Sequence, residues 1–111
     1  MEPRLKPEIW IKALVRQLNM EMITTMVVRK GDPDGGAVYL KVNRFAEGCL
    51  VYSRSYGLDG ERVWAPATGD GPVEEQQADD YIARQVNYDP DCWVIEIEDP
   101  ENNFSIEKYI I

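Results

Sequence analysis

Carboxylate pairs are the side chains of this sequence with the most obvious capacity for chemistry. Glu96 and Glu98 stand two positions apart in an alternating segment, so they share one face of an expected strand. Such a pair can bind a divalent cation or act in acid–base catalysis when a cleft and a third ligand accompany it. The sequence indicates neither a cleft nor a third ligand beside this pair. We therefore interpret the pair as a solvated strand face that discourages edge pairing.

The two cysteines, Cys49 and Cys92, are candidate nucleophiles only if a base, a cation or a helix N-terminus lowers their pKa. The chain contains no histidine, and Asp91 directly precedes Cys92. The absence of histidine also removes Ser-His-Asp triads, Cys-His dyads and histidine zinc sites. We interpret both cysteines as small structural residues, and we expect no catalytic residue, cofactor or metal site.

An acidic, glycine-rich loop occupies positions 31–36 and resembles a calcium loop at first sight. An EF-hand loop starting at Asp32 requires glycine at position 37 and glutamate at position 43, where this chain has Ala37 and Asn43. The loop also lacks the spacing of a phosphate-binding glycine motif. These residues are typical of a turn.

Aromatic and basic residues are interleaved between positions 39 and 56, a composition found on surfaces that bind single-stranded nucleic acid. The most prominent members are Tyr39, Lys41, Tyr52 and Arg54. The formal net charge of −8 disfavours binding to a phosphate backbone. Tyrosines on a sheet face also commonly form cross-strand pairs. Nucleic acid is therefore an unfavoured partner, although the cluster remains a candidate interaction surface.

Hydrophobic periodicity predicts the elements that position these residues. A buried stripe with period 3.6 indicates a helix over 7–20, and a second helix is expected over 72–86. Alternation or β-branched composition indicates strands over 23–29, 37–43, 49–55, 62–65 and 92–98. The turn-forming residues between these segments separate them cleanly.

The predicted fold class is α+β: a helix, a four-stranded antiparallel meander, a helix and a final strand. Both helices are one-sided, so we expect them on one face of the sheet. The final strand could lie between meander strands or at an edge. Residues 1–99 are expected to form one domain. The apolar tail 100–111 is expected to pack on that domain or on a partner.

The charged residues are unevenly distributed along the chain. Positions 1–30 hold six basic and three acidic residues, whereas the rest of the chain holds 6 basic and 17 acidic residues. The basic region could dock on the acidic remainder or present a helix face to an anionic partner. No apolar run approaches the ~20 residues that span a bilayer, and no secretory signal is visible. We predict a cytoplasmic protein without membrane contact.

Three segments resemble domain of unknown function 1491, a family of short alphaproteobacterial proteins. They are Arg4–Leu14, then Arg29–Asp32 with Gly36, and finally Ala83–Glu96. The likeness covers residues 4 to about 99, and the tail is expected to run beyond the usual end. The resemblance implies a small stand-alone protein and supplies no activity, cofactor or catalytic residue. It also suggests Trp10 and Trp93 as core anchors.

The favoured function is a non-enzymatic protein-interaction module with an unknown protein partner, and homodimerisation through the tail or a sheet edge is one form of it. The alternatives are a ligand-binding protein or enzyme that uses carboxylates and tyrosines, and a nucleic-acid accessory protein. The candidate interaction residues are Tyr39, Lys41, Tyr52, Arg54, Arg84, Asp89, Phe104, Ile106 and Ile110.

Overall fold

The computed structural model describes residues 6–56 and 62–106, which form two helices, five strands and a short 3-10 turn. In chain order they are α1 (Pro7–Met20), β1 (Thr24–Arg29), β2 (Val38–Asn43), η1 (Phe45–Glu47), β3 (Cys49–Tyr56), β4 (Arg62–Pro66), α2 (Glu75–Tyr88) and β5 (Trp93–Glu98). The bounds of α1 agree with the predicted helix. Helix α2 begins three residues later than predicted and continues to Tyr88.

The five strands form one sheet in the order β1-β5-β2-β3-β4. Strands β2, β3 and β4 are antiparallel neighbours, as the meander predicted. The four-stranded meander itself is wrong, because β1 pairs with β5 and not with β2. Strand β5 lies between β1 and β2 and runs parallel to β2.

Burial explains why β5 takes the central position. Alternation alone predicts one buried face for β5, yet Trp93, Val94 and Ile95 are all buried in succession. Burial on both faces is typical of an interior strand. In β1, by contrast, only Thr25 is buried. A strand that buries so few of its residues is suited to an edge.

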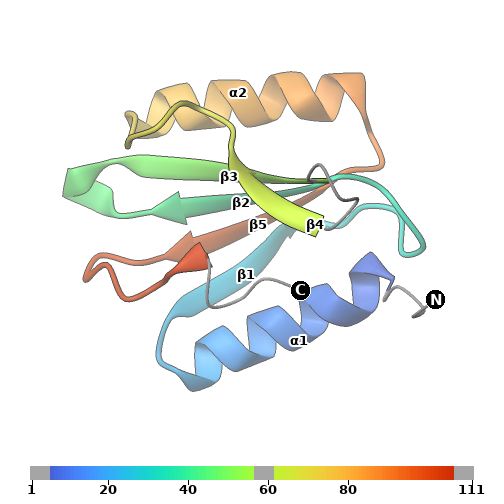
Figure 1. The fold of residues 1–111 in the computed structure, drawn as a ribbon, viewed down its shortest axis with the longest axis horizontal. Helices are drawn as coiled ribbons and strands as arrows, with labels where there is room; N and C mark the ends of the chain where they lie inside the picture. Colours follow the sequence, from blue (N-terminus) through green and yellow to red (C-terminus); the bar gives the residue numbers. More distant parts are fainter. Residues whose placement is uncertain (1–5, 57–61, 107–111) are drawn as a thin grey trace.

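The two helices cover opposite faces of the sheet, so the molecule has three layers (Figure 1). The predicted packing of both helices on one face is therefore wrong. The physical reason is that the sheet is apolar on both sides. One face packs against Trp10, Ile11, Leu14 and Leu18 of α1. On the other face, a smaller cluster forms around Val51 and Ala78 under α2.

The start of the C-terminal tail packs on its own domain. Phe104 is buried in the α1-side core, and Ile106 packs against the same cluster. The Asp99 carboxylate fixes this turn by accepting the backbone N–H groups of Asn103 at 2.7 Å and Phe104 at 3.0 Å. Ile110 lies outside the described residues. Neither described helix has the length and apolar character needed to cross a membrane.

Candidate functional site

The outer edge of the sheet at β1 is the most exposed apolar surface of the strands. Met26, Val27 and Val28 are 39 %, 40 % and 58 % exposed. Within residues 6–56 and 62–106, strand β1 pairs only with β5, so no other described strand lies along the outer side of its backbone. Such an edge usually carries lysine or proline, which prevent pairing with other chains. Strand β1 contains neither, but the Asn19 side chain of α1 accepts the Thr25 N–H at 2.9 Å and donates to the Thr25 carbonyl at 3.0 Å, so the backbone edge is exposed only beyond Thr25.

A β-bulge shapes the far end of this edge. The pairing register shifts between Val27 and Arg29, so Val28 is an extra residue in β1. The Arg29 guanidinium donates a hydrogen bond to the Pro90 carbonyl oxygen at 2.7 Å, which fixes the end of the strand. Lys30 follows directly and is exposed. This end of the edge is therefore basic, and residues 24–27 keep regular pairing.

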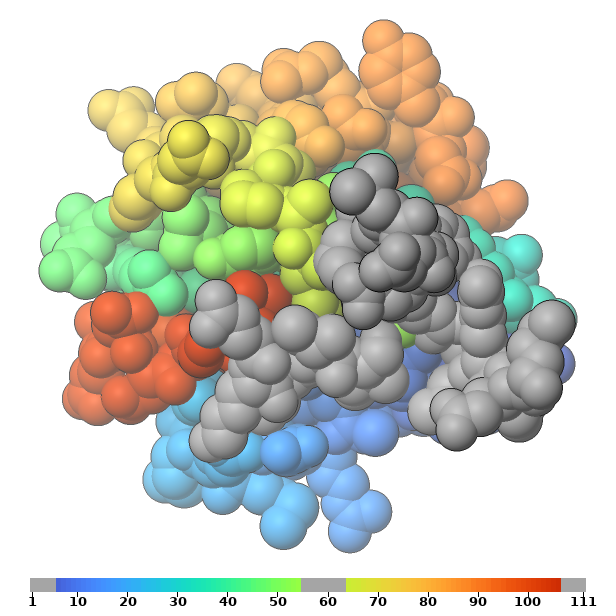
Figure 2. Space-filling model, in the orientation of Figure 1, coloured from blue at the N-terminus to red at the C-terminus, as the bar shows by residue number. Residues whose placement is uncertain are grey.

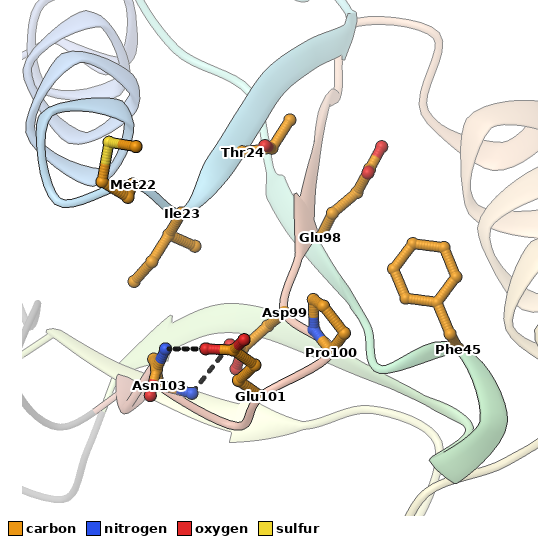
Figure 3. Close-up of a pocket in the computed structure, with 9 residues that line it drawn as sticks. All are labelled: Met22, Ile23, Thr24, Phe45, Glu98, Asp99, Pro100, Glu101 and Asn103. Atoms are coloured by element: carbon orange, nitrogen blue, oxygen red, sulfur yellow. Dashed lines mark hydrogen bonds between the residues drawn. The ribbon is translucent and has the colours of Figure 1, made fainter.

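A pocket of about 400 Å³ lies at the opposite end of β1. Figure 3 shows Met22 and Ile23 on one side, Phe45 on the other, and Asp99 and Pro100 between them. On the molecular surface, the chain around residues 99–105 lies between the β2–β3 connection and the segment that follows α1 (Figure 2). The complete lining is Met22, Ile23, Thr24, Phe45, Glu98, Asp99, Pro100, Glu101 and Asn103.

Two of the apolar lining residues have a left-handed backbone. Met22 has a φ of 66° and Phe45 a φ of 57°, a region that bulky residues rarely adopt. Met22 follows α1 in a Schellman turn, in which the Ile23 N–H donates to the Leu18 carbonyl at 2.9 Å. The Asn43 side chain accepts the Phe45 N–H at 2.8 Å. These local bonds hold two exposed apolar side chains at the pocket.

The pocket is acidic. Glu98 and Glu101 contribute carboxylates to its lining, and the Glu101 carboxylate accepts the Asn103 amide at 3.3 Å. The Asp99 carboxylate is 2 % exposed and is compensated by two backbone N–H donors and by Arg44, whose Nε lies 3.7 Å away. The accessible charge therefore comes from the two glutamates. Apolar side chains beside carboxylates suit a cationic group on an apolar stem.

A second polar cluster centres on Lys41, between the sheet and α2. Its ammonium lies 2.8 Å from Glu75, 2.7 Å from Asp79 and 3.4 Å from Glu96. Burial alone would lower the pKa of Lys41, but the bonds to Asp79 and Glu75 outweigh it and raise this pKa above its ordinary value. Lys41 is therefore a buried cation that holds α2 on the sheet. It keeps its proton at neutral pH and is unsuited to act as a base.

The predicted aromatic and basic cluster does not form one surface. Tyr39 and Lys41 face α2, and the Tyr39 ring lies 6.2 Å from the Tyr81 ring. Tyr52 pairs with Leu40, so it faces α1 together with Arg54. The sheet separates the two pairs. The combined surface on which nucleic-acid binding was considered is thus absent from the described residues.

Arg54 takes part in the α1-side packing. Its guanidinium lies 4.3 Å from the centroid of the Trp10 ring, and the Trp64 ring packs edge-on against Trp10 at 5.8 Å. Trp10 and Trp93 both belong to this core, which confirms their predicted role as anchors. A cation packed on a buried aromatic ring stabilises the core and is poorly placed to meet a partner.

The remaining candidates lie elsewhere. Arg84 is exposed on α2, and Asp89 caps the turn after α2 by accepting the Asp91 N–H at 3.1 Å. Phe104 and Ile106 belong to the core, as described above. None of the described candidates lines the pocket. The residues that sequence reasoning missed, chiefly Met22, Met26 and Phe45, would have been found only from the position of β1 in the sheet.

The cysteines and carboxylates show no further reactive arrangement in the described part of the chain. Burial raises the pKa of both the Cys49 and the Cys92 thiols, which disfavours the nucleophilic thiolate. Across residues 6–56 and 62–106, no three His, Cys, Asp or Glu side chains gather in a way that could hold a metal ion. The exposed β1 edge and the adjoining pocket are therefore taken as the candidate site.

Fold and site together define a small α+β domain of three layers with exposed apolar side chains on one edge strand of its sheet. The chain belongs to DUF1491, a family described as a protein of unknown function, whose model matches residues 5–107. The match runs past residue 99, so the expectation that the tail lies beyond the family's usual end is wrong for its first part. That agrees with the burial of Phe104 in the core.

Solved structures support this assignment. A crystal structure of a DUF1491 family protein from Caulobacter crescentus CB15 is similar, with 37 % identity, a TM-score of 0.79, and coverage of 87 % of this chain and 90 % of that one. An NMR structure of a DUF1491 family protein from the same organism has 36 % identity, a TM-score of 0.77 and 90 % coverage of each chain.

A more distant structure shares the fold. The solution structure of protein Atu0922 from A. tumefaciens has 21 % identity and a TM-score of 0.74, and the match covers 97 % of this chain and 93 % of that one. A search of curated proteins finds no match. The comparisons thus establish the family and the fold.

Proposed function

We propose that this protein is a cytoplasmic protein-interaction module that binds an extended segment of a partner along β1. The observation that carries the proposal is the exposure of Met26, Val27 and Val28 on β1, a strand at the end of the sheet. The Asn19 side chain already bonds the outward backbone groups of Thr25, and an added strand would pair with the backbone beyond Thr25 and cover these exposed side chains. The two free, buried cysteines are compatible with a reducing compartment.

The pocket would supply specificity to this binding mode. In strand addition, backbone hydrogen bonds provide affinity, while pockets for individual side chains select the sequence. Thr24 belongs to β1 and also lines the pocket, and Asn19 bonds the neighbouring Thr25, so a segment that pairs beyond Thr25 would reach the pocket with the residues that follow its paired stretch. The carboxylates of Glu98 and Glu101 favour a basic residue at that end of the bound segment.

In the test, short random peptides are selected for binding to the immobilised full chain. Amide hydrogen exchange of the protein then shows where the selected peptides bind. We expect selected peptides to slow exchange in residues 24–29. The double variant Met26→Lys with Val28→Lys should lose this binding, since it places two charges on the edge. Ala83→Lys, at an exposed position of α2, is the matched control and should bind normally. Peptides that bind the edge variant as well as the wild type would refute the proposal.

A further inference from the structure

The Asn19 side chain of α1 occupies part of the outer edge of β1. Its amide oxygen accepts the Thr25 N–H at 2.9 Å, and its amide nitrogen donates to the Thr25 carbonyl at 3.0 Å. A residue of an added antiparallel strand offers the same acceptor and donor when it forms a hydrogen-bonded pair. At Thr25, Asn19 therefore takes the place of a strand residue.

Local bonds hold both members of this contact in place. The Asn19 carbonyl accepts the Met22 N–H at 3.1 Å in the turn that ends α1. Thr25 is 5 % exposed, and its hydroxyl donates to the Ile23 carbonyl at 2.9 Å. Asn19 itself is exposed, so its side chain has solvent to move into when another group competes for Thr25. The contact is thus preformed, and a competing strand can displace it.

The alternation of an antiparallel ladder limits what remains of the edge. Since the backbone groups of Thr25 point outward, those of its two neighbours point toward β5, and the next outward residue is Val27. The register shift between Val27 and Arg29 then interrupts the regular ladder. In the regular part of β1, a partner's segment therefore meets one outward residue, Val27, while Asn19 keeps its place.

We propose that Asn19 is a specificity-determining residue of the β1 edge, because it sets where a bound segment stops pairing. This inference rests on the function proposed above and deepens it. With Asn19 in place, a segment pairs at Val27 and leaves the edge before Thr25, toward the pocket that Thr24 lines. Pairing across Thr25 requires the segment to displace two hydrogen bonds, which together correspond to a factor of about thirty in an equilibrium constant. The edge therefore selects short paired stretches over long ones.

The test compares Asn19→Ala with the wild type. Random peptides are selected on the variant, and isothermal titration calorimetry measures the affinity of the selected peptides for both proteins as full chains. We expect these peptides to bind Asn19→Ala about tenfold more tightly and to slow exchange of the Thr25 amide in the variant. In the wild type, the Thr25 amide should exchange at the same rate with and without peptide. A purely structural role predicts the reverse order of affinities, since the loss of both bonds would loosen β1 and weaken binding.

Gln17→Ala is the matched control, because Gln17 is exposed on the same helix and its side chain bonds Glu21 at 3.3 Å. Peptides selected on Gln17→Ala should bind that variant and the wild type equally. Asn19→Asp is the second variant and decides the question if Asn19→Ala does not fold. Its carboxylate still accepts the Thr25 N–H but cannot donate to the Thr25 carbonyl, so it should also bind long peptides more tightly than the wild type.

Equal affinity of the folded Asn19 variants and the wild type, with no added protection at Thr25, overturns the inference. If peptides nevertheless protect residues 26–28 of the wild type, the interaction module stands and only the role of Asn19 is refuted. If peptides bind β1 in the variants alone, Asn19 closes the whole edge, so its role is supported and the function proposed for the wild type fails. Binding to none of these proteins refutes both.

Discussion

Replacing Lys41 by methionine should destabilise the protein by about 2 kcal/mol. The variant loses two short charge-assisted bonds, to Glu75 at 2.8 Å and to Asp79 at 2.7 Å, each of a type that contributes roughly 1.5–3 kcal/mol. Two effects reduce the total. Glu75 and Asp79 are about half exposed and can be hydrated in the variant, and the methionine side chain gains roughly 1–2 kcal/mol from burial.

Urea denaturation and thermal melting measure this loss. For a domain of this size, about 2 kcal/mol corresponds to a fall in Tm of roughly 8 °C. The matched control is Lys12→Met. Lys12 pairs with Glu8 at 3.2 Å, but its side chain is 75 % exposed, so the same substitution should change stability by less than about 0.5 kcal/mol. A Lys41→Met protein as stable as the wild type would refute the view that this cation holds α2 on the sheet.

The wild type and the Lys41→Met variant also test how the stabilisation by Lys41 depends on pH. The folded pKa of Lys41 is raised above its ordinary value. Its stabilisation is therefore complete below the unfolded lysine pKa of about 10.4 and is lost as pH rises toward the folded value. The gap between wild type and Lys41→Met should stay constant from pH 7 to about 9 and narrow above about 10.4. A gap that narrows below pH 9 would contradict the assignment.

Further predictions concern packing and thiol access. Phe104→Ala should destabilise the protein by about 3 kcal/mol in urea denaturation, since it empties a buried aromatic site in the core; an unchanged midpoint would show that the tail does not pack there. Gly31→Ala should lower Tm strongly, because a Cβ would overlap the Asp91 carbonyl oxygen, whereas Gly71→Ala has open space and should melt near the wild type. Both cysteine thiols should react slowly with a disulfide reagent at pH 8 in the folded protein and quickly in urea, because burial protects them and raises their pKa; fast reaction of the folded chain would contradict this.

Local patterns in the sequence predict the elements well because local physics determines them. Pro7 and the stripe from Trp10 to Leu18 define α1, and its observed bounds agree with the prediction. The predicted turn at 31–36 is also present: Gly36 has a φ of +92°, and the Gly35 N–H donates to the Asp32 carbonyl at 3.3 Å. Each of these features depends on residues close together in the chain or on a backbone conformation that one residue type favours.

The order of the strands, and the face of the sheet that each helix covers, were not predictable in the same way. Alternation shows which residues of β2 share a face, but it does not say whether a face is solvated or covered by a helix. Lys41 was therefore expected on an interaction surface, yet it is buried and bonds Glu75 and Asp79 of α2. Lysine is rarely buried unless it is paired. Its partners Glu75 and Asp79 come from a helix more than thirty residues away, a distance that no local pattern spans.

The central position of β5 accounts for the place of the β1 edge, of the ion cluster around Lys41 and of the acidic pocket. It moves β1 to the sheet edge, and because α2 packs on β2 and β3, Met26 of β1 stays exposed on that side. It also gives the two carboxylates of the pair, Glu96 and Glu98, different surroundings. Glu96 lies beside Lys41 on the neighbouring strand and joins the ion cluster under α2. Glu98, two residues further along the same face, lies beyond that cluster and lines the pocket at the start of β1. One residue of the pair thus stabilises the fold, and the other contributes negative charge to the pocket.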